Sequence, residues 1–359
     1  MTAMTTALQA GPPLEPPRAP VGRSSARLVD ASRADRAIAV DAWYPAAPDA
    51  AGEPSLYELL PGIGFTAGAR HEAPIANGAH PLVLWSHGRT GTRFAYALLC
   101  EALAARGFIV ISPEHAGDAL ADWLLGTAVD DATNETNRVA DARFVLDAVF
   151  AGDGPLAAFG ACADRDRVAA AGHSYGGFTA LVLASGAEAD PRVRAAAGMQ
   201  SFTRTLPARV FAGIAVPTLL VTGSKDTTTP PATDADRAWA KLGAQPAWRV
   251  DVERAGHQAC SDVGLYTDLA PQVEGLPDFV WDYVNSMAAD ITGTAGDPWR
   301  ETVALHVQIL AAFLDSALAI DVDNGALAID AISQRSGVTV SQRGSFAAVA
   351  AQPRETIGR

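Results

Sequence analysis

One short segment, residues 167–185, most constrains what this chain can fold into. It begins with the apolar run 168–171, turns through Gly172-His173-Ser174-Tyr175-Gly176-Gly177, and continues in small and apolar residues typical of a helix. A serine between small residues, placed between a strand and a helix, is typical of a nucleophile elbow. The glycines let strand and helix approach more closely than a Cβ would allow. The pattern predicts Ser174 as a nucleophile; the alternative for the pentapeptide alone is a glycine-rich turn that contains a serine by chance.

Strand-like and helix-like segments alternate on both sides of this turn. Apolar runs predict strands at 81–86, 108–112, 193–199, 218–222 and 248–252, and helical spacing predicts helices at 92–106, 137–150, 233–242 and 298–318. Continuous apolar strands separated by helices indicate a mostly parallel sheet with helices on both faces. The sequence therefore predicts an α/β fold, which we place in one domain, residues 26–318.

The two ends of the chain are less regular. Residues 1–25 are rich in Ala, Pro and Thr, and we expect them to form a flexible arm. Residues 26–29 and 37–43 read as the opening antiparallel strands, and residues 46–80 read as loop because they contain many Gly, Ala and Pro. Residues 319–359 form a C-terminal extension in which 338–340 is the one strand-like stretch.

Composition narrows the partners. The net charge of −13 argues against nucleic acid and anionic membranes. Three cysteines do not make a disulfide framework, although a bridge between Cys162 and Cys260 stays open. No apolar run reaches the roughly 18–20 residues that cross a bilayer. The first thirty residues lack a basic start followed by an apolar stretch, so we read no signal peptide and expect a cytoplasmic protein.

Two further residues complete a catalytic pattern with Ser174. Asp226 follows the strand 218–222, and His257 follows the strand 248–252. Because reactive groups gather at the carboxyl ends of parallel strands, we expect the three side chains to meet. A histidine takes the proton of the attacking serine, and a carboxylate orients its ring. Asp226 could instead be a turn residue, and in that case Asp190 or Asp262 would supply the carboxylate.

The intermediate of such a reaction carries an oxyanion that needs two N–H donors. We assign them to the backbone of Tyr175, directly after the nucleophile, and of Arg89, in the loop after strand 81–86. His87 and His173 are expected to pack or hydrogen-bond beside the site, in the substrate pocket. We predict no cofactor and no metal, because 114–118 (Glu-His-Ala-Gly-Asp) has poor ligand spacing and a Gly-x-Gly-x-x-Gly phosphate loop is absent.

With these motifs, residues 27–318 resemble the platelet-activating-factor acetylhydrolase and dienelactone-hydrolase-like branch of the α/β-hydrolases. The resemblance lies in Trp43-Tyr44-Pro45, Ser86-His87-Gly88 and the elbow. It implies an α/β-hydrolase fold and a serine esterase. Two features depart from the pattern. The animal acetylhydrolases place their acid after the strand that follows the elbow helix, where this chain has Gln200-Ser201, and dienelactone hydrolases generally use Cys as the nucleophile.

Residues 258–298 carry several large side chains, among them Tyr266, Phe279, Trp281 and Tyr283. We expect this segment either to cover the pocket, with Trp281 against the substrate, or to fill core under the last helix.

The sequence predicts a hydrolase of carboxylic esters, of class EC 3.1.1, acting on short or medium acyl esters or on an extended or polymeric ester. An amidase or peptidase with the same triad, and an inactive binding protein, are the alternatives. The oligomeric state is left open.

Overall fold

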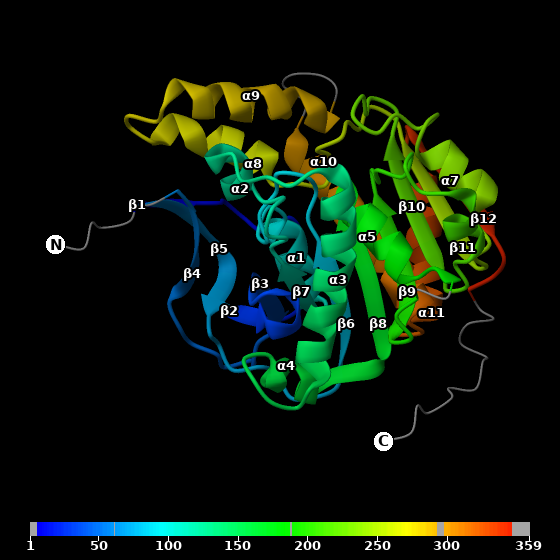
Figure 1. Cartoon of the computed structure of the whole chain (residues 1–359), viewed down its shortest axis with the longest axis horizontal. Helices are drawn as coiled ribbons and strands as arrows, with labels where there is room; N and C mark the ends of the chain where they lie inside the picture. The colour runs from blue at the N-terminus through cyan, green and yellow to red at the C-terminus, as the bar shows by residue number, and fades with distance from the viewer. Residues whose placement is uncertain (1–5, 61, 187–188, 293–297, 347–359) are drawn as a thin grey trace.

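The computed structural model describes residues 6–60, 62–186, 189–292 and 298–346. In these residues twelve strands form one sheet in the order β1-β5-β2-β3-β7-β6-β8-β9-β10-β11-β12, with β4 paired to β5 (Figure 1). The neighbours from β7 to β11 are all parallel. The strands are β1 (Thr6–Gln9), β2 (Val21–Asp30), β3 (Arg36–Pro45), β4 (Pro54–Leu60), β5 (Ile63–His71), β6 (His80–Ser86), β7 (Ile109–Pro113), β8 (Ala163–His173), β9 (Val193–Met199), β10 (Thr218–Gly223), β11 (Ala247–Val252) and β12 (Val338–Arg343).

Helices cover both faces of the sheet. One face packs against α1 (Ala97–Ala105), α10 (Trp299–Ala317) and α11 (Val322–Ser333). The other packs against α3 (Asp131–Phe150), α4 (Ala157–Cys162), α5 (Tyr175–Leu183), α6 (Ala208–Ala212) and α7 (Ala235–Lys241). The predicted mostly parallel α/β fold is confirmed.

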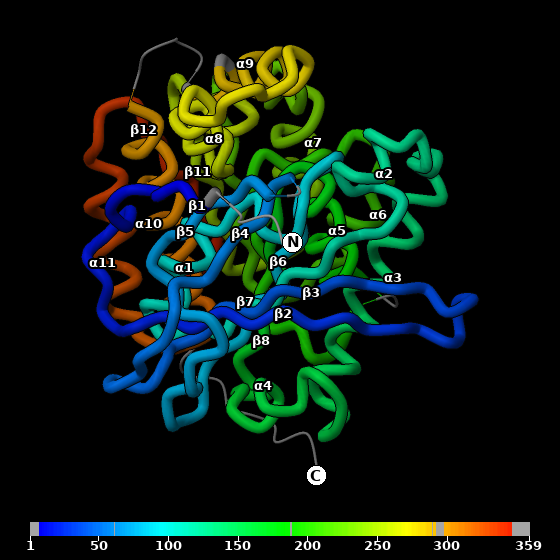
Figure 2. The backbone as a smooth tube through the Cα atoms, turned by 90° about the vertical axis from the view of Figure 1, so that its left-hand side faces the viewer, coloured from blue at the N-terminus to red at the C-terminus, as the bar shows by residue number. Residues whose placement is uncertain are grey.

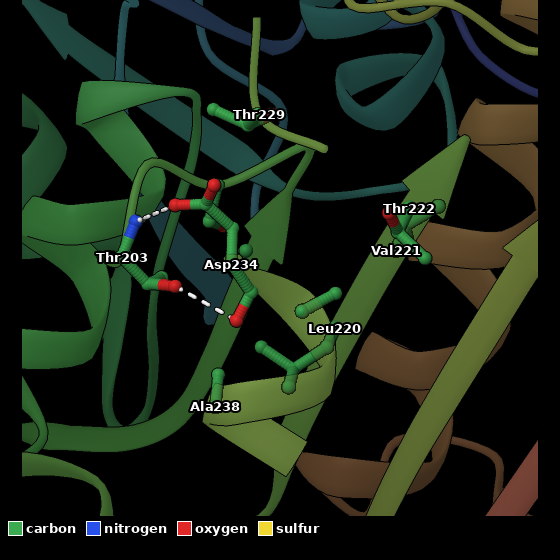
Figure 3. A pocket seen from close by; sticks show the side chains of 10 residues that line it. Thr203, Leu220, Val221, Thr222, Thr229, Asp234 and Ala238 are labelled. Atoms are coloured by element: carbon green, nitrogen blue, oxygen red, sulfur yellow. Dashed lines mark hydrogen bonds between the residues drawn. The ribbon is translucent and has the colours of Figure 1, made fainter. Parts of the chain in front are cut away.

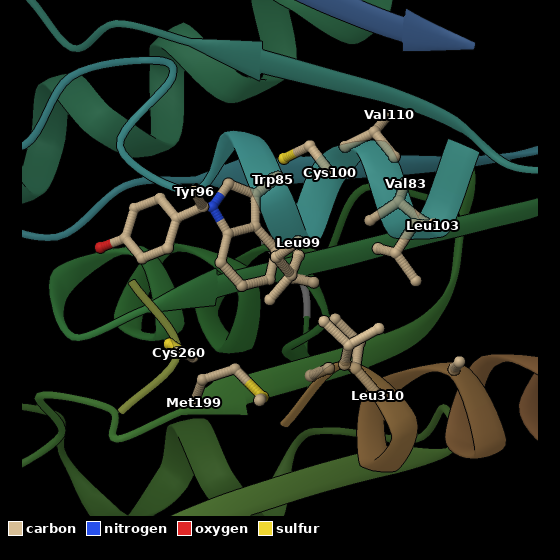
Figure 4. Packing of buried hydrophobic residues seen from close by; sticks show 14 of the residues in the cluster. Val83, Trp85, Tyr96, Leu99, Cys100, Leu103, Val110, Met199, Cys260 and Leu310 are labelled. Carbon is tan, nitrogen blue, oxygen red and sulfur yellow. The ribbon is translucent and has the colours of Figure 1, made fainter. Parts of the chain in front are cut away.

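The alternation of side chains along β6 shows how one strand supplies both cores. Val83 and Trp85 point to the α1 side, where they meet Leu99 (Figure 4). Leu82 and Leu84 belong to the opposite core. Successive side chains of a strand point to opposite faces, so a continuous apolar run is what a strand buried on both sides requires.

Three further helices complete the described part of the fold. They are α2 (Leu120–Leu125), α8 (Val263–Leu269) and α9 (Asp278–Thr292), with the short 3₁₀ turns η1 (Ala31–Arg33) and η3 (Ala270–Gln272). Figure 1 shows α8 and α9 together at one end of the molecule. There they lie against the loops that carry the candidate site.

The N-terminal part of the chain is more ordered than the sequence suggested. Residues 46–80, predicted as loop, contain β4 and β5. The prediction missed them because the alternation of exposed and buried residues in β4 lies in a stretch rich in Gly and Pro. Residues 1–25, predicted as a flexible arm, contain β1 and the start of β2. Pairing with β5 gives β1 the backbone hydrogen bonds that an isolated arm would lack. Residues 1–5 lie outside the described residues.

The predicted opening strands form a long hairpin, β2–β3, which Figure 2 shows running beside the central strands. At the other end, the strand-like stretch 338–340 is part of β12, which pairs antiparallel with β11. The C-terminal extension therefore continues the sheet up to Arg343. All three cysteines are free thiols. In the described part of the chain, each helix is too short or too polar to cross a bilayer.

Candidate active site

Ser174 occupies a strained turn between β8 and α5. Its backbone lies at φ 55° and ψ −118°, a conformation that a non-glycine residue adopts only where its surroundings enforce it. Its N–H donates to the carbonyl of Met199 at 3.0 Å. Gly176 must lack a side chain, because a Cβ there would overlap the carbonyl oxygen of Ser86. The elbow thus presents the Ser174 hydroxyl beyond the end of the sheet.

The structure brings Asp226 and His257 together from the ends of β10 and β11. Nδ1 of His257 lies 3.0 Å from Oδ2 of Asp226, and both residues are buried. A carboxylate can only accept, so Nδ1 carries the proton and Nε2 is left as the basic nitrogen. Burial disfavours the Asp226 anion, but hydrogen bonds from His257 and Thr229 outweigh it and lower the pKa of Asp226. The Asp226 carboxylate is therefore ionised and can stabilise a protonated His257 ring.

Thr229 supports this pair and was missed by the sequence analysis. Its N–H donates to Oδ1 of Asp226 at 2.6 Å, and its hydroxyl lies 2.6 Å from Oδ2. The same hydroxyl lies 2.9 Å from the carbonyl of Gln200 and 3.1 Å from His257 Nδ1. The only sequence signal is an Asp three residues before a Thr, a spacing typical of a side chain that accepts a local backbone N–H.

Behind Thr229 lies a small cavity of about 10 Å³, shown in Figure 3. Asp234 forms one wall and accepts the N–H of Thr203 at 2.7 Å, while its own carbonyl accepts the Thr203 hydroxyl at 3.0 Å. A space of this size holds at most one water molecule. It is a packing feature behind the acid loop and cannot receive a substrate.

The loop after β6 contains a backbone donor without a partner. The N–H of Gly88 donates to the Tyr96 hydroxyl. The N–H of Thr90 donates to the carbonyl of Asp118, and that of Gly91 donates to the carbonyl of Gly88. Between them, the N–H of Arg89 has no acceptor among the described residues, and the same holds for the N–H of Tyr175 at the first turn of α5. The Arg89 side chain points away to Asp131 at 2.5 Å.

His173 links three parts of the site. Its Nε2 lies 2.7 Å from the carbonyl of His257, which can only accept, so Nε2 carries the proton. Nδ1 is then an acceptor for the Tyr96 hydroxyl at 2.7 Å, and this hydroxyl in turn accepts the N–H of Gly88. Burial and the neighbouring His257 hold the pKa of His173 well below its usual value, which keeps the ring neutral.

His87 has a different place from the one predicted. It is fully buried and does not line the large cavity described below. Its Nδ1 donates to the carbonyl of Gly88, and its Nε2 accepts the N–H of His115. The buried Arg138 donates to the carbonyls of His87 and Gly88 at 2.8 and 3.2 Å. His87 therefore helps to fix the loop that carries Arg89 and is separated from any substrate.

A cavity of about 880 Å³ opens directly over these residues. Ser174, His173 and His257 lie on its floor, and most of its walls are apolar. The walls come from α9 (Phe279, Val280, Tyr283, Val284, Met287 and Asp290), from α8 and η3 (Val263, Tyr266, Leu269 and Ala270), from α2 (Leu120, Trp123 and Leu124) and from β4 and β5 (Leu59, Leu60 and Ile63).

Trp281, predicted to face the substrate, does not line this cavity. The lining residues of α9 recur at Val280, Tyr283, Val284 and Met287, which is one face of a helix. Trp281 follows Val280 and therefore points about 100° away from that face. Within the segment 258–298, residues up to Asp290 do line the cavity, through other large side chains. Across the cavity, Tyr283 stacks on Trp123 with ring centroids 5.8 Å apart.

The other candidate acids serve elsewhere. Asp190 pairs with Arg192 at 2.6 Å. Asp262 is fully buried beside α1, where burial raises its pKa well above the usual value. In the segment 114–118, each ionisable side chain contacts another partner: Glu114 pairs with Arg93, His115 with Asp141 and Asp118 with Arg138. Among the described residues, none of the His, Cys, Asp and Glu groups has a metal-binding arrangement.

The chain is similar to known ester hydrolases in sequence and in fold. The family model described as PETase, PET hydrolase-like, matches residues 62–270. A solved structure of a ferulic acid esterase from Streptomyces cinnamoneus is similar, with a TM-score of 0.66 and 25% sequence identity. That alignment covers 88% of this chain and 94% of the esterase.

Proposed function

The chain belongs to the PET hydrolase-like family and is a carboxylic ester hydrolase with the α/β-hydrolase fold, and from this premise we propose that Ser174, His257 and Asp226 carry out the hydrolysis. The predicted reaction class and the predicted resemblance to α/β-hydrolase esterases are confirmed. The observation that supports the triad most is the contact between His257 Nδ1 and Asp226 Oδ2 at 3.0 Å, on the cavity that Ser174 also lines.

The proposed mechanism proceeds through an acyl-enzyme. As Oγ of Ser174 attacks the ester carbonyl carbon, Nε2 of His257 takes its proton and Asp226 stabilises the imidazolium. The carbonyl oxygen becomes an oxyanion, which accepts hydrogen bonds from the N–H groups of Arg89 and Tyr175. The intermediate collapses, the C–O bond breaks, and the alkoxide leaves with the proton held by His257. Water then attacks the acyl-serine by the same steps and releases the acid and free Ser174.

The cavity supports a substrate with a sizeable apolar part. Its volume of about 880 Å³ lies within the range of pockets that enclose drug-sized ligands, roughly 300–1,000 Å³. Its apolar walls favour an alkyl or aryl group, whereas its floor carries the polar groups that would act on the ester. We therefore extend the expectation of short or medium acyl groups to bulkier ones.

A fluorophosphonate probe tests the proposed nucleophile. We expect the probe to label the purified protein, and Ser174→Ala to lose both labelling and ester hydrolysis while its circular dichroism spectrum stays unchanged. Hydrolysis that persists in Ser174→Ala would refute the triad. Matched p-nitrophenyl esters and p-nitroanilides separate an esterase from an amidase or peptidase. An unlabelled, inactive wild-type protein would point to a binding role.

A further inference from the structure

The C-terminal end of α9 is joined to the loop that carries His257. The N–H of His257 donates to Oδ1 of Asp290 at 2.9 Å. On either side, the N–H of Gly256 donates to the carbonyl of Ile291 at 2.9 Å, and that of Gln258 to the carbonyl of Asp290 at 2.7 Å. Three consecutive N–H groups are thus held by two residues of one helix. The backbone of the catalytic loop is fixed from the α9 side.

Both partners are shaped for this junction. Asp290 has a non-helical backbone (φ −96°, ψ 15°), which kinks α9 where its side chain and carbonyl meet the loop. Gly256 must lack a side chain, because a Cβ there would overlap the carbonyl of Asp290. A side chain at position 256 would therefore push α9 and the loop apart.

The same helix forms a wall of the large cavity. Val280, Tyr283 and Val284 line it, and so does Asp290 itself. Tyr283 also contacts the loop after β6, which carries the predicted oxyanion donor Arg89. Its hydroxyl lies 3.3 Å from Oγ1 of Thr90. A substrate that fills the cavity therefore contacts α9. The C-terminal end of this helix is bonded to the loop of His257, and its Tyr283 contacts the loop after β6.

We propose that Asp290 is a positioning residue for His257, and that α9 thereby couples contact with the apolar part of the substrate to the alignment of the base. The inference rests on the proposed function. The ring of His257 is held through Nδ1, which contacts the side chains of Asp226 and Thr229, and these contacts fix its rotation. Asp290 fixes the backbone from which that ring projects. A bulky group packed against α9 holds the helix in the position in which the Asp290 acceptor meets the His257 N–H, so binding energy far from the ester favours the reactive geometry.

The test compares two substitutions of Asp290 with one control substitution, at the exposed Asp282 of the same helix. We expect Asp290→Ala to lower kcat by roughly 10²-fold, the effect of a misplacement of about 1 Å, with KM little changed. Asp290→Asn keeps an acceptor oxygen at the same place and is expected to restore kcat to within about threefold of wild type. Asp282→Ala removes a charge from α9 without touching the loop, and is expected to behave as wild type.

Two esters, p-nitrophenyl acetate and p-nitrophenyl octanoate, test the coupling. In the wild type we expect the longer ester to have the higher kcat, and in Asp290→Ala we expect this ratio to fall toward one. Unchanged kcat in folded Asp290→Ala, a loss confined to KM, or an equal loss in Asp290→Asn would each overturn the proposal. If Asp290→Ala does not fold, Gly256→Ala, which forces the same junction apart, gives the same test.

The result is separable from that for the triad. If Ser174→Ala is inactive and Asp290→Ala is as active as wild type on both esters, the triad stands and the positioning role fails. If Ser174→Ala keeps its activity, the proposed function fails whatever Asp290 does.

Discussion

The hydroxyl of Tyr96 is a sensitive point of the site, and Tyr96→Phe removes one oxygen atom from it. This residue is 3% exposed. Its hydroxyl accepts the N–H of Gly88 at 3.2 Å and donates to Nδ1 of His173 at 2.7 Å. The substitution leaves both partners buried and unpaired. Each unpaired buried group costs about 1–3 kcal/mol, so we expect the free energy of unfolding to fall by about 2–6 kcal/mol.

Such a loss is large beside the total stability of a typical domain, about 5–15 kcal/mol. We expect a lower urea midpoint with an unchanged m-value, and a lower kcat because Gly88 precedes Arg89 and His173 holds the carbonyl of His257. Tyr283→Phe is the matched control for stability. Within the described part of the chain, its hydroxyl has one hydrogen-bond contact, at 3.3 Å to a partly buried Thr90, and we expect a change below about 0.5 kcal/mol.

A double-mutant cycle with His173→Ala isolates the contact itself. Once the imidazole is absent, Tyr96→Phe no longer leaves Nδ1 unpaired, so its cost should fall. We expect the two losses to be non-additive by about 0.5–3 kcal/mol. Strict additivity, or a Tyr96→Phe enzyme as stable and active as wild type, would refute the inference that this hydroxyl joins the two loops.

Two further predictions concern the cavity and the buried histidines. Val284→Trp fills the cavity wall, and kcat/KM for p-nitrophenyl octanoate should fall at least about tenfold while that for the acetate changes little; equal losses for both esters would contradict the assignment. Burial lowers the pKa of His115 and of His306 to about 4, so from about pH 6.5 down to 4 the unfolded chain binds protons that the folded protein does not. Stability should therefore fall with pH across this window, by up to about 1.4 kcal/mol per unit for each histidine. Burial raises the pKa of Asp315 to about 6, so this group takes up a proton in the folded protein and partly opposes the loss of stability. His306→Gln should make the urea midpoint depend less steeply on pH, and an unchanged slope would refute the lowered pKa of His306.

The strands that the sequence indicated most clearly were those buried on both faces. The run 193–199 coincides with β9, and 218–222 falls within β10, because a strand between two helical layers must be apolar throughout. The edge of the sheet was harder to predict. β4 alternates exposed and buried residues, and its pairing with β5 is broken by bulges. Their pattern is therefore weak in a stretch rich in Gly and Pro.

At the site, the residues set by local chain geometry were predictable, and those set by tertiary contact were not. Ser174 was indicated by its own turn, whereas Thr229 and Asp290 carry no comparable motif. Asp290 lies beyond His257 in sequence and reaches it only because α9 folds back over the cavity. Trp281 was chosen by its size, but helical phase decides which side of α9 meets the cavity.

The position of the acid can be understood from what occupies the end of β9. In the animal acetylhydrolases that the sequence resembles, an acid follows this strand. Here Gln200 occupies that place, at a positive φ of 40°, with its side-chain amide 2.9 Å from Nε2 of His306. Its carbonyl instead accepts the hydroxyl of Thr229, whose N–H donates to Asp226. The end of β9 therefore still supports the carboxylate, through its backbone. An Asp placed at 200 would replace the amide that contacts His306 with a buried carboxylate, which is costly to bury without a donor of its own.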